Sequence, residues 1–266
     1  MTTFALKDAK AASVRRTGIV LICLVSFLWA LMEIVIEHIP GGYSLYQVVW
    51  VRYATHLLFM LVIIAPRHAR DLITTRHPGL QILRALMMLV MPVSFILASE
   101  YINVGTILSV FWLSPLIIIG LSMLLLRENV SWQYWLASII GFVYAVVLYH
   151  SRGAITATGI MLSLAMSLSF SLYVVMTRML REETTSANLF YTALGVLVPL
   201  SFRLPAFWKP LTLQSALMMA LVGMLGFILL WVLDKASDMT SSAALAPFLF
   251  TQVLWMVVLD LIIKIL

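Results

Sequence analysis

The chain has 266 residues, of which 63% are hydrophobic and 11% are charged, and its mean hydropathy is +1.06. Soluble domains are roughly 45–50% apolar and about 25% charged, so this composition excludes a water-soluble globular fold. The net charge of +6 comes from basic residues in short segments between apolar windows, which indicates membrane orientation rather than nucleic-acid binding. The single cysteine, Cys23, cannot form a disulfide framework or a cysteine metal site within the chain.

Apolar windows of roughly 17–25 residues recur along the chain, and each is long enough to cross a bilayer as a helix. They predict an all-α polytopic membrane protein with about nine transmembrane helices, over residues 18–36, 45–65, 80–99, 102–126, 132–149, 155–177, 187–203, 214–233 and 241–263. Short polar loops are expected between them, for example at 66–79, 127–131, 178–187 and 234–240. The first window is longer than the apolar region of a signal peptide and has no convincing cleavage site after it, so it is predicted to be an uncleaved span.

The distribution of basic residues predicts the orientation, because cytoplasmic loops carry an excess of Lys and Arg. With residues 1–17 as a cytoplasmic tail, the cytoplasmic side holds Lys7, Lys10, Arg15, Arg16, Arg67, Arg70, Arg76, Arg84, Arg127, Arg178, Arg181 and Lys235. The opposite side holds only Arg152, Arg203, Lys209 and Lys264. We therefore expect a multi-pass protein of the inner (plasma) membrane with a cytoplasmic N-terminus.

A weak internal repeat divides the chain into two parts. Thr17-Gly18-Ile19 at the start of the first window recurs as Thr158-Gly159-Ile160 in the sixth, and Ala98-Ser99-Glu100 recurs as Ala236-Ser237-Asp238. This predicts a first repeat of five spans over 18–149 and a second repeat of four spans over 155–266. An odd number of spans inverts the second copy, as in many secondary transporters. Chance similarity between apolar helices is the alternative explanation.

Several of these motifs together resemble the EamA-type members of the drug/metabolite transporter superfamily. The resemblance rests on Arg84, Ala98-Ser99-Glu100-Tyr101, Val104-Gly105-Thr106, Ser114-Pro115-Leu116, Leu124-Leu125-Leu126-Arg127-Glu128, Ala246-Pro247-Phe248 and Trp255. Two features depart from the family. Arg127-Glu128 stands where the family usually has Gly-Glu, and the repeat offset places the counterpart of Glu128 at Leu266, so the family's tenth helix is not expected here.

Ionisable side chains inside the predicted spans are costly, by about 2.5–3.5 kcal/mol at mid-helix, and each needs an explanation. Glu33 in the first span and Arg52 in the second lie at similar depth if the two helices form an antiparallel hairpin. They are predicted to be a coupled pair, either as a structural ion pair or as a proton or substrate site. Asp260 and Lys264 are four residues apart and are expected to pair with each other.

Aromatic and small polar residues supply the candidate substrate site on the helices that, by resemblance, surround a central cavity. The candidates are Trp29, Glu33, Ser94, Tyr101, Asn103, Trp112, Ser163, Ser167, Tyr173, Gln252 and Trp255. Ser163 and Ser167 belong to a stripe that continues to Ser171, and either helix packing or cavity lining explains such a stripe. For each aromatic candidate, an interfacial or lipid-facing position is an equal alternative.

The function favoured by this pattern is secondary transport of a small metabolite or amphipathic compound by alternating access, with export as the favoured direction. No nucleophile with a base, metal-ligand cluster or phosphate-binding loop is evident, so no enzyme activity, cofactor or metal is expected. The expected partners are a small-molecule solute and the lipid bilayer, with no nucleic acid, and a homodimer is left open. The alternatives are a non-transporting scaffold or partner subunit, an inactive truncated transporter and, more distantly, a membrane-embedded transferase.

Overall fold

The computed structural model describes residues 2–149 and 155–265, and the side chains from Ser13 onward. Arg152, Leu266 and the side chains of Lys7 and Lys10 lie outside this part. The described residues form helices joined by short loops and contain no strand. In chain order these are α1 Thr2–Glu37, α2 Leu45–Phe59, the π-helical turn η1 Met60–Ile64, α3 Ala65–Ile73, α4 Pro78–Ala98, α5 Val104–Phe111, α6 Ser114–Leu125, α7 Trp132–Leu148, α8 Ala157–Met179, α9 Thr185–Ser201, α10 Leu204–Phe207, α11 Leu213–Met239, α12 Ser242–Leu245, the 3₁₀ turn η2 Ala246–Phe250 and α13 Thr251–Ile265.

Within the described part, seven helical segments are long and apolar enough to cross a membrane: Ser13–Glu37, Leu45–Ile73, Pro78–Ala98, Val104–Leu125, Ala157–Met179, Leu213–Met239 and Ser242–Ile265. Trp132–Leu148 is a shorter apolar helix, and α9 coincides with the remaining predicted window. The predicted class, an all-α polytopic membrane protein, is therefore confirmed.

Many of these helices begin at a residue whose side chain caps the first turn. The caps are Ser44, Asn103, Ser131, Thr156, Thr184, Thr212 and Ser241, each of which accepts a hydrogen bond from a backbone N–H in the first turn of the helix. These oxygen acceptors satisfy N–H groups that have no partner inside the helix. Local sequence thus explains where the helices start.

Two predicted loops are partly helical. The segment 66–79 contains most of α3, which has Pro66 in its first turn, where the missing N–H of proline costs nothing. The segment 234–240 is predicted as the loop after the eighth span, but α11 continues through Met239. The reason is that Asp234 is buried and bonded inside the bundle, so its polarity does not mark a helix end.

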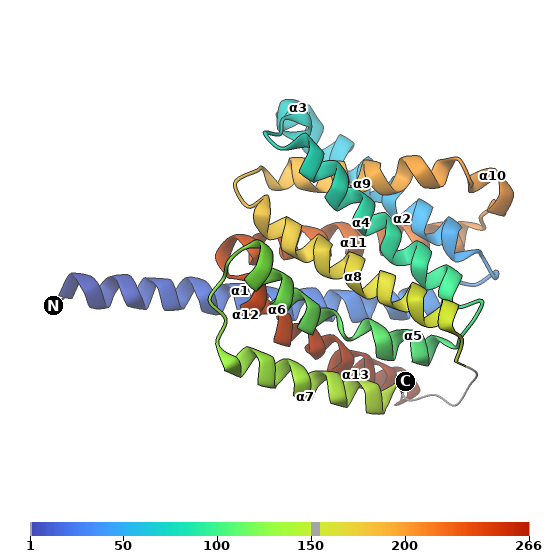
Figure 1. The fold of residues 1–266 in the computed structure, drawn as a ribbon. Coiled ribbons are helices and arrows are strands. Elements are labelled where there is room, and N and C mark those ends of the chain that lie inside the picture. Colours follow the sequence, from blue (N-terminus) through green and yellow to red (C-terminus); the bar gives the residue numbers. More distant parts are fainter. Residues whose placement is uncertain (1, 150–154, 266) are drawn as a thin grey trace.

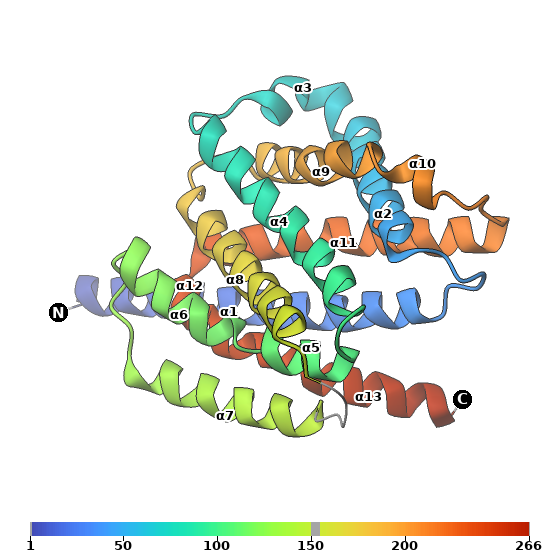
Figure 2. The ribbon, with the colours of Figure 1, turned by 45° about the vertical axis from the view of Figure 1, so that its right-hand side comes forward.

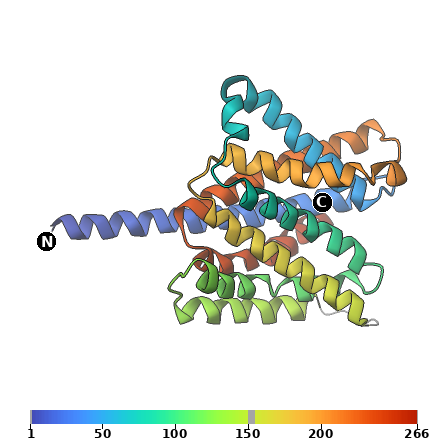
Figure 3. The ribbon, with the colours of Figure 1, turned by 45° about the horizontal axis from the view of Figure 1, so that its top comes forward.

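The helices pack side by side as a bundle, from which the first turns of α1 extend beyond one end (Figure 1). We call this end the N face; α4 and α9 begin there, and α8 and α11 end there (Figures 1 and 2). Segments distant in sequence are neighbours: α11 packs against both α1 and α2, and α4 packs against α8 and α9. Figure 3 shows α4 and α8 lying along each other over most of their length.

Two of the spans are interrupted near the middle of the bundle. The fourth span breaks between α5 and α6 at Trp112, ahead of Pro115, and the last span contains the 3₁₀ turn η2 with Pro247. Proline removes a backbone N–H and so favours such breaks. The two interruptions touch, because the ring centres of Trp112 and Phe250 lie 5.3 Å apart. Discontinuous helices of this kind often lie beside the substrate site of a transporter.

Candidate functional site

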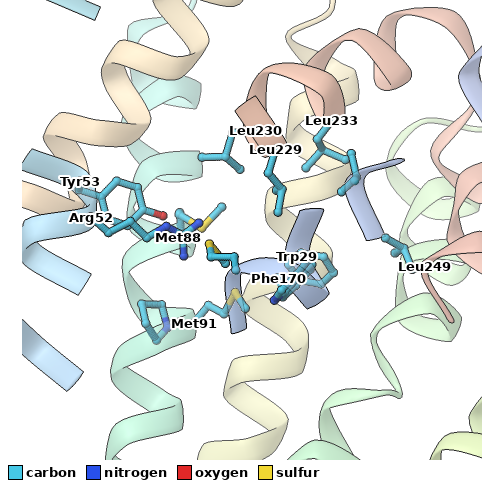
Figure 4. A pocket seen from close by; sticks show the side chains of 13 residues that line it. Trp29, Arg52, Tyr53, Met88, Met91, Phe170, Leu229, Leu230, Leu233 and Leu249 are labelled. Carbon is cyan, nitrogen blue, oxygen red and sulfur yellow. The ribbon is translucent and has the colours of Figure 1, made fainter. Parts of the chain in front are cut away.

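A pocket lies between α1, α2, α4, α8 and α11, with Leu249 of η2 at its edge (Figure 4). Most of its lining is apolar or aromatic, and among the described residues Arg52 is its single charged side chain. The lining comprises Val25, Trp29, Met32, Arg52, Tyr53, Met88, Met91, Pro92, Phe170, Leu229, Leu230, Leu233 and Leu249.

Arg52 is held in the pocket by its own helix and by α11. Its guanidinium carbon lies 5.2 Å from the centre of the Tyr53 ring, within range of a cation–π interaction. It also lies against Gly226, where a Cβ atom would come within 2.6 Å of Arg52 Nε. One turn earlier, Gly223 lets the two backbones approach, since a Cβ there would lie 2.8 Å from the Arg52 carbonyl oxygen. The glycines of α11 therefore make the space that Arg52 occupies.

Among the described residues, no carboxylate lies within salt-bridge distance of Arg52. A guanidinium presents several N–H donors in a fixed plane that matches a carboxylate or phosphate. In this apolar surrounding, a bound anionic group would form charge-assisted hydrogen bonds that water competes for weakly. Arg52 is therefore a suitable binding group for an anionic part of a solute.

The opposite wall is aromatic. Trp29 makes edge-to-face contacts with Phe170, at 5.1 Å between ring centres, and with Phe111, at 5.9 Å. Trp29 and Phe170 lie together in the pocket (Figure 4), which Met88 and Met91 also line. Aromatic faces can stack on a flat ring, and methionine side chains adapt to irregular shapes. This wall suits a planar, largely apolar group.

The predicted pair of Glu33 and Arg52 forms no direct contact within 4 Å among the described residues, and its coupling stays a prediction. The Glu33 carboxylate accepts a hydrogen bond of 2.8 Å from Gln252 Nε2 on α13. The predicted pair requires α1 and α2 to be direct neighbours. In the structure, α11 packs against both of them, and α1 also packs against α13. The predicted pair Asp260 and Lys264 does form, at 2.6 Å.

The serine stripe on α8 faces the break between α5 and α6. Ser167 donates to the Phe111 carbonyl at 2.9 Å and lies 3.1 Å from Ser114 Oγ, while Ser171 donates to the Ser114 carbonyl at 3.1 Å. Ser163 donates to the carbonyl of Gly159, one turn earlier on its own helix. All three are fully buried and none lines the pocket. The contacts of Ser167 and Ser171 join α8 to the α5–α6 break, as expected if the stripe serves helix packing.

The other predicted site residues lie in several places. Asn103 caps α5 by accepting from the Thr106 N–H at 2.8 Å, and Trp112 packs on Phe250. Tyr173 is buried under the guanidinium of Arg84 at 5.1 Å, and Ser94 is buried in α4 outside the pocket lining. Two are more open: Tyr101 is 47% exposed and Trp255 is 37% exposed. Of the predicted substrate residues, the structure thus brings only Trp29 to the described pocket, together with Arg52 of the predicted pair.

Sequence reasoning missed two charged residues inside the bundle. The loop and orientation predictions place Arg84 and Asp234 on the cytoplasmic side, but their exposed fractions are 1% and 3%. Their burial could have been inferred from their positions in the sequence, because Arg84 lies inside one apolar window and Asp234 directly follows another. Tyr53 and Phe170 were missed because an aromatic side chain in a span carries no mark of the face it occupies.

Comparisons with known proteins agree with this architecture. A model of the EamA-like transporter family matches residues 16–149. An S-adenosylmethionine uptake transporter of Rickettsia bellii is 24% identical over 186 residues, which cover 70% of this chain and 64% of that protein. A protein of the same name from Rickettsia prowazekii is 23% identical over 234 residues, covering 84% and 79%. This chain thus spans less than two thirds of the first relative.

The fold itself is also found in a solved structure. A crystal structure of another protein superposes with a TM-score of 0.80 at 15% identity, covering 95% of this chain and 88% of that one. At this identity the likeness shows the fold alone. Because the family model covers half of the chain, the chain belongs to the EamA-like transporter family of the drug/metabolite transporter superfamily, as its residue pattern predicts.

Proposed function

We propose that this chain is a secondary transporter that takes up a small solute bearing a carboxylate by alternating access. The observation that carries the proposal is Arg52, a cation with no carboxylate of the described residues in direct contact, in an otherwise apolar and aromatic pocket. The pocket lies among helices of both predicted repeats and borders the interrupted last span, which is the usual position of a substrate site in inverted-repeat transporters.

S-adenosylmethionine is the first solute to test, because relatives of this chain are named as its uptake transporters. Its carboxylate matches the Arg52 guanidinium, and its adenine ring matches the aromatic wall of Trp29 and Phe170. Its sulfonium cation can lie against an aromatic face, which attracts positive charge. The names of the relatives favour uptake, so we replace the export direction expected from the sequence.

The test is counterflow of labelled S-adenosylmethionine in proteoliposomes loaded with unlabelled compound. Competition with the decarboxylated analogue isolates the contribution of the carboxylate. For the wild type we expect the decarboxylated analogue to compete poorly. Arg52→Gln should weaken binding of the parent compound by roughly tenfold or more, the effect of losing hydrogen bonds to a charged group, and should leave the analogue almost unchanged.

The matched control is Arg203→Gln, which removes an exposed basic residue outside the pocket. It should preserve flux and selectivity. If Arg52→Gln still discriminated between the two compounds as the wild type does, the proposal that Arg52 binds the carboxylate would be contradicted. Absence of flux in the folded wild type for any tested solute would favour the scaffold alternative.

A further inference from the structure

A buried polar network lies beside the pocket, toward the N face. Arg84 precedes the pocket residue Met88 by four residues on α4, and Asp234 directly follows the pocket residue Leu233 on α11. Along the helix axes these separations correspond to about 6 Å on α4 and about 1.5 Å on α11. The network therefore lies between the pocket and the N face of the bundle.

Arg84 is the centre of this network. Its guanidinium donates to Thr177 Oγ1 of α8 at 3.1 Å, to Thr192 Oγ1 of α9 at 2.8 Å and to the carbonyl of Asn188. It also lies 3.9 Å from Asp234 Oδ1 on α11. One side chain of α4 thus binds three other helices.

Asn188 completes the connections. Its Nδ2 donates to Asp234 Oδ1 at 2.8 Å, and its Oδ1 accepts from Gln81 Nε2 of α4 at 2.7 Å. All of these side chains are almost fully buried. The result is one layer of polar contacts that crosses from α4, in the first predicted repeat, to α8, α9 and α11 in the second.

The chemistry of this layer does not suit a permanent structural tie. A buried ion pair costs much of its Coulomb energy in desolvation, and apolar side chains of similar volume would often hold the helices at least as well. Three of its atoms, Arg84 Nε, Gln81 Oε1 and Asp234 Oδ2, also have no hydrogen-bond partner in the described part of the protein. Polar groups that regain water when the helices part would make opening less costly than it is for an apolar seal.

We propose that Arg84, Asp234 and Asn188 form a gate that closes the pocket toward the N face and opens when α4 separates from α8, α9 and α11. In the predicted orientation the N face is cytoplasmic, so the gate is closed on the cytoplasmic side. The inference rests on the proposed function, because alternating access gives the two sets of helices a reason to part. Weakening the gate should shift the population toward the state open at the N face.

The experiment measures access to the pocket and requires no substrate. Cys23→Ser removes the single cysteine, and Met88→Cys then places a thiol at the end of the pocket next to Arg84. A membrane-impermeant thiol reagent is applied to each side of sealed vesicles of known orientation. Asp234→Asn removes the charge and retains the shape of the side chain. It should raise labelling from the N-face side roughly tenfold, corresponding to a population shift of about 1.4 kcal/mol.

Two further variants make the result decisive. Asp260→Asn removes the carboxylate of an exposed pair, Asp260 and Lys264, and should leave labelling unchanged. Thr192→Val removes one acceptor of Arg84 at constant shape, and should shift labelling in the same direction by a smaller factor if Asp234→Asn does not fold. If folded Asp234→Asn and Thr192→Val variants showed unchanged labelling from the N-face side, the proposed gate would be contradicted. A labelling shift without flux of any solute would support the gate and contradict the proposed transport. Flux with unchanged labelling would contradict the gate and leave the proposed transport standing.

Discussion

Gly226 offers the sharpest test of how the pocket is built, because an added methyl group there would meet the guanidinium of Arg52. A Cβ atom at Gly226 would lie 2.6 Å from Nε and 3.2 Å from both Cζ and Nη2 of Arg52. These distances are too short to persist, so Gly226→Ala must displace the guanidinium. The displaced atoms are the far end of a flexible side chain, which can move without shifting the backbone.

The expected effects on stability and on binding differ in size. Replacing glycine by alanine inside a helix stabilises it by roughly 0.5–1 kcal/mol, and forcing Arg52 from its rotamer costs about 0.5–1.5 kcal/mol. The two terms nearly cancel, so the free energy of unfolding should change by no more than about 1 kcal/mol. Displacing a charged hydrogen-bond donor from the solute removes about 1.5–3 kcal/mol, which corresponds to roughly a 10- to 100-fold loss of affinity.

Two other glycines serve as comparisons. At Gly223 the nearest atoms are Thr55 Cβ, at 2.6 Å, and the Arg52 carbonyl oxygen, at 2.8 Å, so Gly223→Ala must separate the α2 and α11 backbones and should destabilise the fold by about 1–3 kcal/mol. At Gly120 no atom lies within 4 Å of an added Cβ, so Gly120→Ala should change neither binding nor folding adversely.

Thermal denaturation of the purified protein, with and without S-adenosylmethionine, measures both quantities, because a ligand that binds only the folded state raises its apparent stability. The expected order of apo stability is Gly120→Ala, then Gly226→Ala, then Gly223→Ala. Gly226→Ala alone should combine near-normal stability with a lost ligand shift. A full ligand shift in Gly226→Ala would refute a direct contact between the Arg52 guanidinium and the solute.

Three further predictions address the packing and the orientation. Glu33→Gln and Gln252→Leu should be coupled by about 1 kcal/mol in a double-mutant cycle of thermal stability, and Glu33→Gln and Arg52→Gln should be coupled more weakly because no direct contact joins them; the reverse order would restore the predicted ion pair. Ser167→Leu should lower stability by about 1–3 kcal/mol because the site is filled by α5 and α6, and an unchanged melting temperature would contradict this packing. A reporter active only in the cytoplasm should be active in the loop 127–131 and inactive in the loop 208–212, and the opposite result would invert the predicted orientation.

Much of the secondary structure follows from the sequence for a local reason. A span in a bilayer must satisfy its backbone hydrogen bonds within the segment, so long apolar windows form helices whatever surrounds them. Caps such as Asn103 and pairs such as Asp260 and Lys264 act over three or four residues and are equally local. These features could therefore be predicted from sequence spacing.

Which residues meet was decided by the tertiary structure. Transmembrane helices are apolar on most faces, so their sequences carry little indication of the face that packs inward. The packing of α13 against α1 gives Glu33 the partner Gln252, and the packing of α11 against α2 leaves Arg52 at the pocket. The same packing buries Arg84 beside Asp234, although they are 150 positions apart in the chain. Such contacts depend on how four or five helices fit together, and no periodicity within a single helix encodes that arrangement.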